Sequence, residues 1–210
     1  MSDGSRYWRP PGYALLALAA AVGVLVGLTA ALLHSGHAPA ATPPGPLSAQ
    51  VTWAAGAKRA PAFSLVDQDG RRIGLRSLRG HPVLVTFLDS RCKRECPVEG
   101  RVLGNVLRKL NRTQAVVLIV SVDPWADTTA SVREFAARAH WRGDWHWLLG
   151  RKAALAPVWR AFGIGVKRVP GDVLHQVALY VVDGEGDLRS AYLFPFSAEA
   201  VTSDVRRLSS

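Results

Sequence analysis

The two cysteines of this 210-residue chain, Cys92 and Cys96, are the residues best suited to chemistry. They follow an apolar run, residues 83–88, whose length and β-branched content predict a buried strand. From residue 102 to 110 apolar residues recur at helical spacing, so the cysteines stand where a strand ends and a helix begins. The free N–H groups of a helix N-terminus favour a thiolate. If the helix has begun by Cys92, the four-residue spacing places both sulfurs on one side of its first turn.

Two cysteines four residues apart allow three kinds of site: a structural disulfide, a redox-active dithiol or a pair of soft metal ligands. A disulfide that closes so short a loop restricts the unfolded chain little, and a domain of this size does not need one. The basic side chains beside the cysteines favour the thiolate form, and they are Arg91, Lys93 and Arg94. The cysteine pair alone leaves redox chemistry and metal binding both open.

Five of the six histidines carry weak signals. Two lie in a proline-rich segment and are interpreted as solvated side chains: His34 and His37. His81 stands in a turn before the strand at 83–88. His140 and His146 lie among tryptophans, where a packed or half-exposed aromatic cluster is the simpler interpretation. We assign none of these five to a metal.

The chain is strongly basic, with 26 Lys and Arg against 16 Asp and Glu and a formal charge of +10. Such a balance is compatible with nucleic acid, a membrane surface or an acidic partner. The basic residues are mostly scattered arginines without a long run, and no nucleic-acid-binding motif is present. We therefore expect no nucleic-acid partner.

An uncharged, mostly apolar run fills residues 12–33, which is long enough to cross a bilayer as a helix. Arg6 and Arg9 precede it, so the positive-inside rule keeps the N-terminus in the cytoplasm. The alternative is a cleaved signal peptide with a small-residue site at 38–40, although its apolar core would be unusually long. Both interpretations place the remaining chain outside the cytoplasm, where thiols meet oxidants.

The sequence thus predicts four segments along the chain. They are a cytoplasmic N-terminus at 1–11, a transmembrane anchor at 12–33, a Pro/Ala-rich linker at 34–60 and a folded domain at 61–210. A single-pass protein of the cell membrane, with its domain on the extracytoplasmic side, is the expected arrangement.

Within the domain, strand and helix patterns alternate. We expect a hairpin at 63–75, strands at 83–88, 115–122, 145–149, 177–182 and 188–194, and helices from 127, at 153–162 and at 198–208. Such alternation predicts an α/β fold with a hairpin at the end of the sheet.

Three motifs give the chain a resemblance to the SCO/SenC copper proteins. Residues 63–70, Phe-Ser-Leu-Val-Asp-Gln-Asp-Gly, are similar to an opening shared by many thioredoxin-like proteins. Residues 92–97 resemble the family's CxxxCP, whereas thioredoxins use CxxC. Residues 120–128, with Ser-Val-Asp-Pro and then Asp-Thr, resemble its SVDPxxDT. The resemblance covers roughly residues 61–210 and implies a thioredoxin-like domain.

The resemblance also implies a metal site. The family places a histidine eight residues before the acidic residue of the last hairpin turn, which here is His175 before Asp183. With Cys92 and Cys96 it would complete a copper site, and two thiolates with one imidazole suit copper, whereas structural zinc normally takes four protein ligands. The chain departs from the family at Leu174, where an aspartate is usual.

By resemblance, the expected function is a membrane-anchored copper metallochaperone for the CuA centre of cytochrome c oxidase or another copper protein. The alternative is an extracytoplasmic thiol–disulfide oxidoreductase or a peroxidase-like enzyme of the same fold. A peroxidase would need a hydroxyl before its reactive cysteine, for which Ser90 is the near candidate, and reductases usually have proline where this chain has Val177. A redox-sensing partner protein is a third possibility. Enzymatic activity is not expected of a copper metallochaperone.

Overall fold

The computed structural model of the protein describes residues 46–110 and 114–209. The predicted transmembrane anchor at 12–33, like His34 and His37, lies outside these ranges. Within them, no helix combines the length and the apolar character that a membrane span requires.

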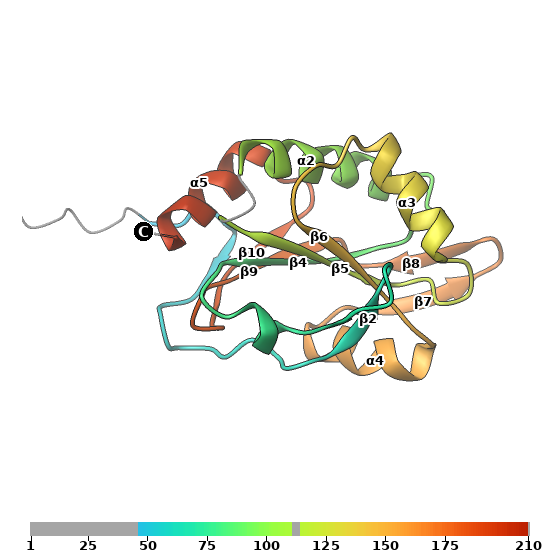
Figure 1. Cartoon of the computed structure of the whole chain (residues 1–210), viewed down its shortest axis with the longest axis horizontal. Helices are drawn as coiled ribbons and strands as arrows, with labels where there is room; N and C mark the ends of the chain where they lie inside the picture. The colour runs from blue at the N-terminus through green and yellow to red at the C-terminus, as the bar shows by residue number, and fades with distance from the viewer. Residues whose placement is uncertain (1–45, 111–113, 210) are drawn as a thin grey trace, which may run out of the picture. The chain divides into compact units, whose positions relative to one another are not determined.

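An eight-stranded mixed sheet forms the centre of the fold (Figure 1). Its strand order is β1-β10-β9-β4-β5-β6-β2-β3, in which β4, β5 and β6 are parallel and the other neighbours are antiparallel. The strands are β1 Val51–Thr52, β2 Leu65–Asp67, β3 Arg72–Ile73, β4 Val83–Leu88, β5 Val116–Ser121, β6 Trp145–Leu149, β9 Ala178–Val182 and β10 Leu188–Leu193.

Helices cover both faces of this sheet (Figure 1). They are α2 Glu95–Lys109, α3 Thr129–Arg138 and α5 Ala198–Leu208 on one face, with α4 Lys152–Ala161 and the 3-10 turn η1 Leu75–Leu78 on the other. Because side chains alternate along a strand, β4 contributes to two cores. Leu84 and Leu88 pack with α2, α3 and α5, whereas Val85 and Phe87 pack with α4.

The two central parallel strands bring the motif segments together. Every residue of β4 and of β5 is buried, as expected for strands covered on both faces. Their register pairs Val83 with Val116 and Leu88 with Ser121, so the two strands end side by side. The cysteine segment that follows Leu88 therefore lies next to the Asp-Pro segment that follows Ser121.

Most predicted elements are present, and three of them have the predicted bounds: the strands at 83–88 and 145–149 and the helix at 198–208. The expected start of the domain at residue 61 is too late. Val51 and Thr52, in the predicted linker, pair with Ala191 and Ser190 at the edge of the sheet. A two-residue strand is too short to leave a periodic signal, and only its pairing defines it.

A second hairpin was also not predicted. The segment between the predicted helix at 153–162 and the predicted strand at 177–182 contains strand β7 Val166–Val169, which pairs with β8 Asp172–His175 in a separate two-stranded sheet. Its residues are largely exposed, so the run lacks the alternation that marks a half-buried strand. This hairpin carries His175 at its end.

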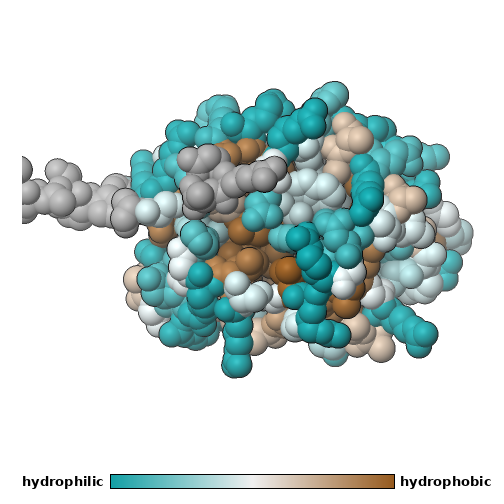
Figure 2. Space-filling model, in the orientation of Figure 1, coloured by the Kyte–Doolittle hydropathy of each residue, from teal (hydrophilic) through white to brown (hydrophobic). Residues whose placement is uncertain are grey.

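Apolar exposure is limited. Figure 2 shows that hydrophilic side chains cover most of the face seen in Figure 1, around a smaller apolar area. Among the described residues, six large apolar side chains are exposed: Val51, Val66, Val98, Trp125, Leu174 and Leu193. Val98 lies two residues after Cys96, and Leu174 lies directly before His175, so both segments of the expected metal site present an apolar side chain to solvent.

Candidate metal centre

Cys92 and Cys96 lie at the start of α2, but only one of them belongs to the helix. The helix begins at Glu95, so Cys96 is in its first turn while Cys92 is in the preceding loop. The backbone N–H of Cys92 donates to the carbonyl of Asp89, which turns this loop back toward the end of β4. Both thiols are free; Cys92 is half-buried and Cys96 is buried. The helix has not begun at Cys92, so the condition under which the four-residue spacing would place both sulfurs on one side of its first turn is not met.

The two thiols have opposite acidities. The hydrogen bond from the Cys96 thiol lowers the pKa of Cys92 to about 6, and the backbone N–H groups of Arg94 and Cys96 act in the same direction. The same hydrogen bond, together with burial, raises the pKa of Cys96. At neutral pH the accessible sulfur is therefore a thiolate and the buried one is a thiol that donates to it.

This asymmetry predicts the reactivity of Cys92. Since alkylation requires the thiolate, its rate constant for Cys92 should rise through a midpoint near pH 6, instead of the value of about 8.5 for a free cysteine. Cys96→Ala removes the hydrogen bond and should move the midpoint upward. The measurement is the pH dependence of iodoacetamide labelling, located by mass spectrometry. A midpoint near that of free cysteine in the unaltered protein would contradict the prediction.

His175 lies at the end of β8 and points toward Cys96. Its Nε2 is 3.7 Å from Cys96 Sγ, although the two residues are 79 positions apart. A transition metal holds sulfur at about 2.3 Å and imidazole nitrogen at about 2.0–2.1 Å, so both atoms are close enough to reach one ion. The structure therefore brings together the histidine and the buried cysteine that the resemblance paired.

The imidazole of His175 is oriented by the backbone. Its Nδ1–H donates a hydrogen bond to the carbonyl oxygen of Gln176, 2.9 Å away. Burial lowers the pKa of His175, so the ring is neutral at pH 7, with its lone pair on Nε2, on the side of Cys96. In metal sites a carboxylate often fixes the tautomer. Here the preceding residue is Leu174, whose apolar side chain cannot accept a hydrogen bond, and the Gln176 carbonyl supplies the orientation.

A cavity of about 330 Å³ lies between the cysteine loop and the end of β8. Cys92 and His175 both line it, together with Leu174, Phe194 and Arg94. Within residues 46–110 and 114–209, no three His, Cys, Asp or Glu side chains are already gathered closely enough to enclose a metal ion. A site with three ligands would therefore require the side chains of Cys92, Cys96 and His175 to draw closer together than they are here.

The segment that follows β5, with Asp123, Pro124 and Asp127, holds the cysteine loop through hydrogen bonds. Asp127 Oδ1 accepts from the backbone N–H and the hydroxyl of Ser90, at 2.9 and 2.5 Å, and its Oδ2 accepts from Ser121 Oγ at 2.6 Å. Ser90 Oγ is also 2.7 Å from Ser131 Oγ in α3. From the sequence, Asp127 was recognised only as part of the segment that resembles SVDPxxDT and as a helix start. Its carboxylate in fact ties the loop before Cys92 to β5, and Ser90 is engaged in that support.

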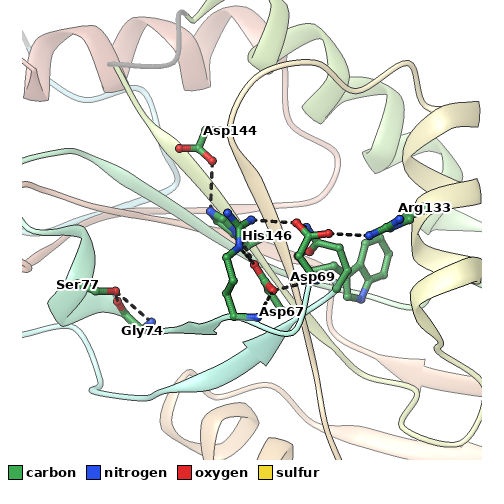
Figure 3. A network of polar contacts seen from close by, with 10 residues as sticks. Asp67, Asp69, Gly74, Ser77, Arg133, Asp144 and His146 are labelled. Atoms are coloured by element: carbon green, nitrogen blue, oxygen red, sulfur yellow. Dashed lines mark hydrogen bonds and ion pairs between the residues drawn. The ribbon is translucent and has the colours of Figure 1, made fainter.

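Trp141, Trp145 and Trp147 form the aromatic cluster expected from the sequence, but His146 lies in a polar network instead. His146 Nδ1 lies 2.9 Å from Asp67 Oδ2, and its Nε2 lies 3.2 Å from Asp144 Oδ1 (Figure 3). Asp69 joins the same network through an ion pair with Arg133 on α3 (Figure 3). Both ring nitrogens are thus occupied by carboxylates. The network fastens the β2–β3 turn to β6 and α3 and contains no donor from the cysteine loop.

Comparison with known proteins settles the family. The SCO1/SenC family model matches residues 53–210. The chain belongs to the SCO1/SenC family. The mitochondrial SCO2 homolog of Bos taurus is 31% identical over 157 residues, which cover 69% of this chain and 58% of the bovine protein. The SCO1 homolog of Bacillus subtilis is 29% identical over 137 residues, which cover 62% of this chain and 71% of that protein.

Solved structures of SCO proteins have the same fold. Bradyrhizobium japonicum ScoI with copper bound superimposes with a TM-score of 0.63 at 27% identity, covering 71% of this chain and 99% of that chain. BsSco, described as a Sco-family cytochrome c oxidase assembly protein with a disulfide switch, gives a TM-score of 0.63 at 25% identity, covering 76% of this chain and 98% of that chain. The SCO1/SenC domain of this protein is therefore a mixed α/β, thioredoxin-like fold, as expected.

Proposed function

We propose that this protein is a membrane-anchored copper metallochaperone that binds copper through Cys92, Cys96 and His175. The observation that carries the proposal is the 3.7 Å separation between Cys96 Sγ and the Nε2 of a neutral, oriented imidazole. Two thiolates and an imidazole form a soft donor set that fits reduced copper well. The copper-bound ScoI structure supports the choice of metal. Copper is the cargo in this proposal.

The proposed recipient is the CuA-bearing subunit of cytochrome c oxidase or another copper protein. BsSco, which shares the fold, belongs to a family of oxidase assembly proteins, and this supports the assignment. Exposed basic side chains flank the site and would attract an acidic recipient: Arg91, Lys93, Arg94, Lys167 and Arg168. Transfer should therefore slow as ionic strength rises.

The experiment is copper binding and transfer by the purified full-length chain. We expect one copper(I) per chain, held against a competing chelator, and a sulfur-to-copper charge-transfer band with copper(II). Copper should then appear on an apo CuA domain, more slowly at high salt. Failure to bind copper under reducing conditions would refute the proposal.

A thiol–disulfide oxidoreductase is the second candidate, and the thiol asymmetry favours it. An accessible thiolate at Cys92 backed by a buried thiol at Cys96 has the order of an attacking and a resolving cysteine. The same experiment separates the two functions: fast reduction of a disulfide substrate without copper binding would support the oxidoreductase.

The membrane location is also a proposal. The apolar run at 12–33, preceded by Arg6 and Arg9, supports a cytoplasmic N-terminus and an extracytoplasmic domain. An alkaline phosphatase fused after Ser210, active only outside the cytoplasm, should be active in cells. The same fusion without residues 1–33 serves as the control and should be inactive. Activity of a cytoplasmic reporter at the same position would contradict this topology.

A further inference from the structure

Glu99 is a buried carboxyl group one helical turn after Cys96, and the proposed copper chemistry gives it no task. Its side chain has no exposed surface. Its Oε1 lies 2.5 Å from Thr86 Oγ1, and its Oε2 has no hydrogen-bond partner among the described residues. A buried carboxylate with a single neutral partner would be strongly destabilising. The burial of Glu99 with an unpaired Oε2 therefore needs a physical explanation.

Counting protons around Thr86 shows which form of Glu99 fits. Thr86 Oγ1 is also 3.0 Å from the carbonyl oxygen of Ala178, which can only accept. A threonine hydroxyl has one proton to donate. Both contacts are hydrogen bonds only if Thr86 donates to Ala178 and Glu99 carries the proton that it donates to Thr86. Burial, opposed by the contact with Thr86, also raises the pKa of Glu99 to about 8.

These three residues connect the two halves of the metal site. Glu99 is on α2, the helix that contains Cys96. Thr86 lies between Leu84 and Leu88 on β4, so its side chain faces α2. Ala178 begins β9, three residues after His175. An ionised Glu99 would take the Thr86 proton for itself and leave the Ala178 carbonyl without this donor.

We infer that neutral Glu99 is a positioning residue for the metal site, which acts with Thr86 to hold the Cys96 turn at a set distance from the strand that follows His175. A neutral Glu99 also avoids a further negative charge close to Cys92 and Cys96, which would both be thiolates when copper is bound. This inference rests on the proposed copper site and names the buried contacts that hold its ligands in place.

The test compares four variants of the full-length chain. Glu99→Gln keeps a neutral donor to Thr86, whereas Glu99→Leu removes it, and Thr86→Val removes the hydroxyl. Thr202→Val is the matched control, because Thr202 is also a buried threonine, but its hydroxyl has no partner among the described residues and lies on α5. Copper(I) affinity is measured by chelator competition, copper(II) geometry by electron paramagnetic resonance, and folding by thermal unfolding.

Glu99→Gln and Thr202→Val should match the unaltered protein in affinity and spectrum. Glu99→Leu and Thr86→Val should lose about 10–100-fold in affinity and change the copper(II) spectrum, as loss of supporting contacts does at metal sites. If Glu99→Gln keeps its copper affinity while Glu99→Leu loses it, the hydrogen bond to Thr86 is responsible, because both side chains fill similar space.

Normal affinity and spectrum in Glu99→Leu would overturn the inference while leaving the proposed function intact; absence of copper binding by the unaltered protein would instead refute the function. If Glu99→Leu does not fold, Thr86→Val decides. A Glu99→Gln protein that binds as weakly as Glu99→Leu, or that does not fold, would also overturn it, because the ionised carboxylate would then be the required form.

Discussion

Replacing either Cys92 or Cys96 by serine is expected to lower copper affinity by more than about 100-fold, beyond the usual cost of losing a supporting contact. One thiolate and one imidazole leave an incomplete site that is open to water. Cys96 is buried and faces His175, while Cys92 lines the cavity, so neither can substitute for the other. Chelator competition for copper(I) measures the effect.

Stability should respond differently from affinity in these variants. Cys96→Ser places a hydroxyl at a fully buried position, which costs about 1–3 kcal/mol when it is poorly paired. Cys92→Ser changes a half-buried side chain and should cost less. Both proteins should still unfold cooperatively on heating. Copper binding of normal strength by either folded variant would exclude a site that uses two thiolates.

Replacing His175 by alanine is expected to lower copper(II) affinity by more than about 100-fold, while copper(I) should be weakened less. Imidazole is the harder ligand of the three, and two thiolates alone still hold reduced copper in part. The backbone carbonyl of Gln176 orients this ring, so the unaltered protein already presents Nε2 to the site. Affinities for both oxidation states are measured in parallel.

The same variant separates the two candidate functions. The acidity of Cys92 comes from Cys96 and nearby backbone N–H groups, not from His175, so disulfide exchange should continue in His175→Ala. His81→Ala, at an exposed histidine before β4, is the control and should change neither property. Unchanged copper affinity together with a collapsed exchange rate would favour the oxidoreductase.

The sequence by itself determined most of the elements and the place of the two cysteines in the fold. The apolar runs at β4 and β6 and the amphipathic pattern of α5 gave the correct bounds, because hydrophobic periodicity is a local property of a buried element. The position of both cysteines after a central strand, close to a helix start, followed from the same patterns. The partner histidine came from family resemblance, since nothing local to His175 marks it as a ligand.

The tertiary structure alone decided which distant groups meet. The β1 and β7–β8 pairings depend on partners elsewhere in the chain, so short or exposed segments such as residues 51–52 carry no periodic signal. The contact between Cys96 and His175 joins residues 79 positions apart, and the hydrogen bond between Glu99 and Thr86 joins residues 13 positions apart. The register of β4 with its neighbours and the packing of α2 on the sheet create both contacts, and the pattern of a single element contains neither.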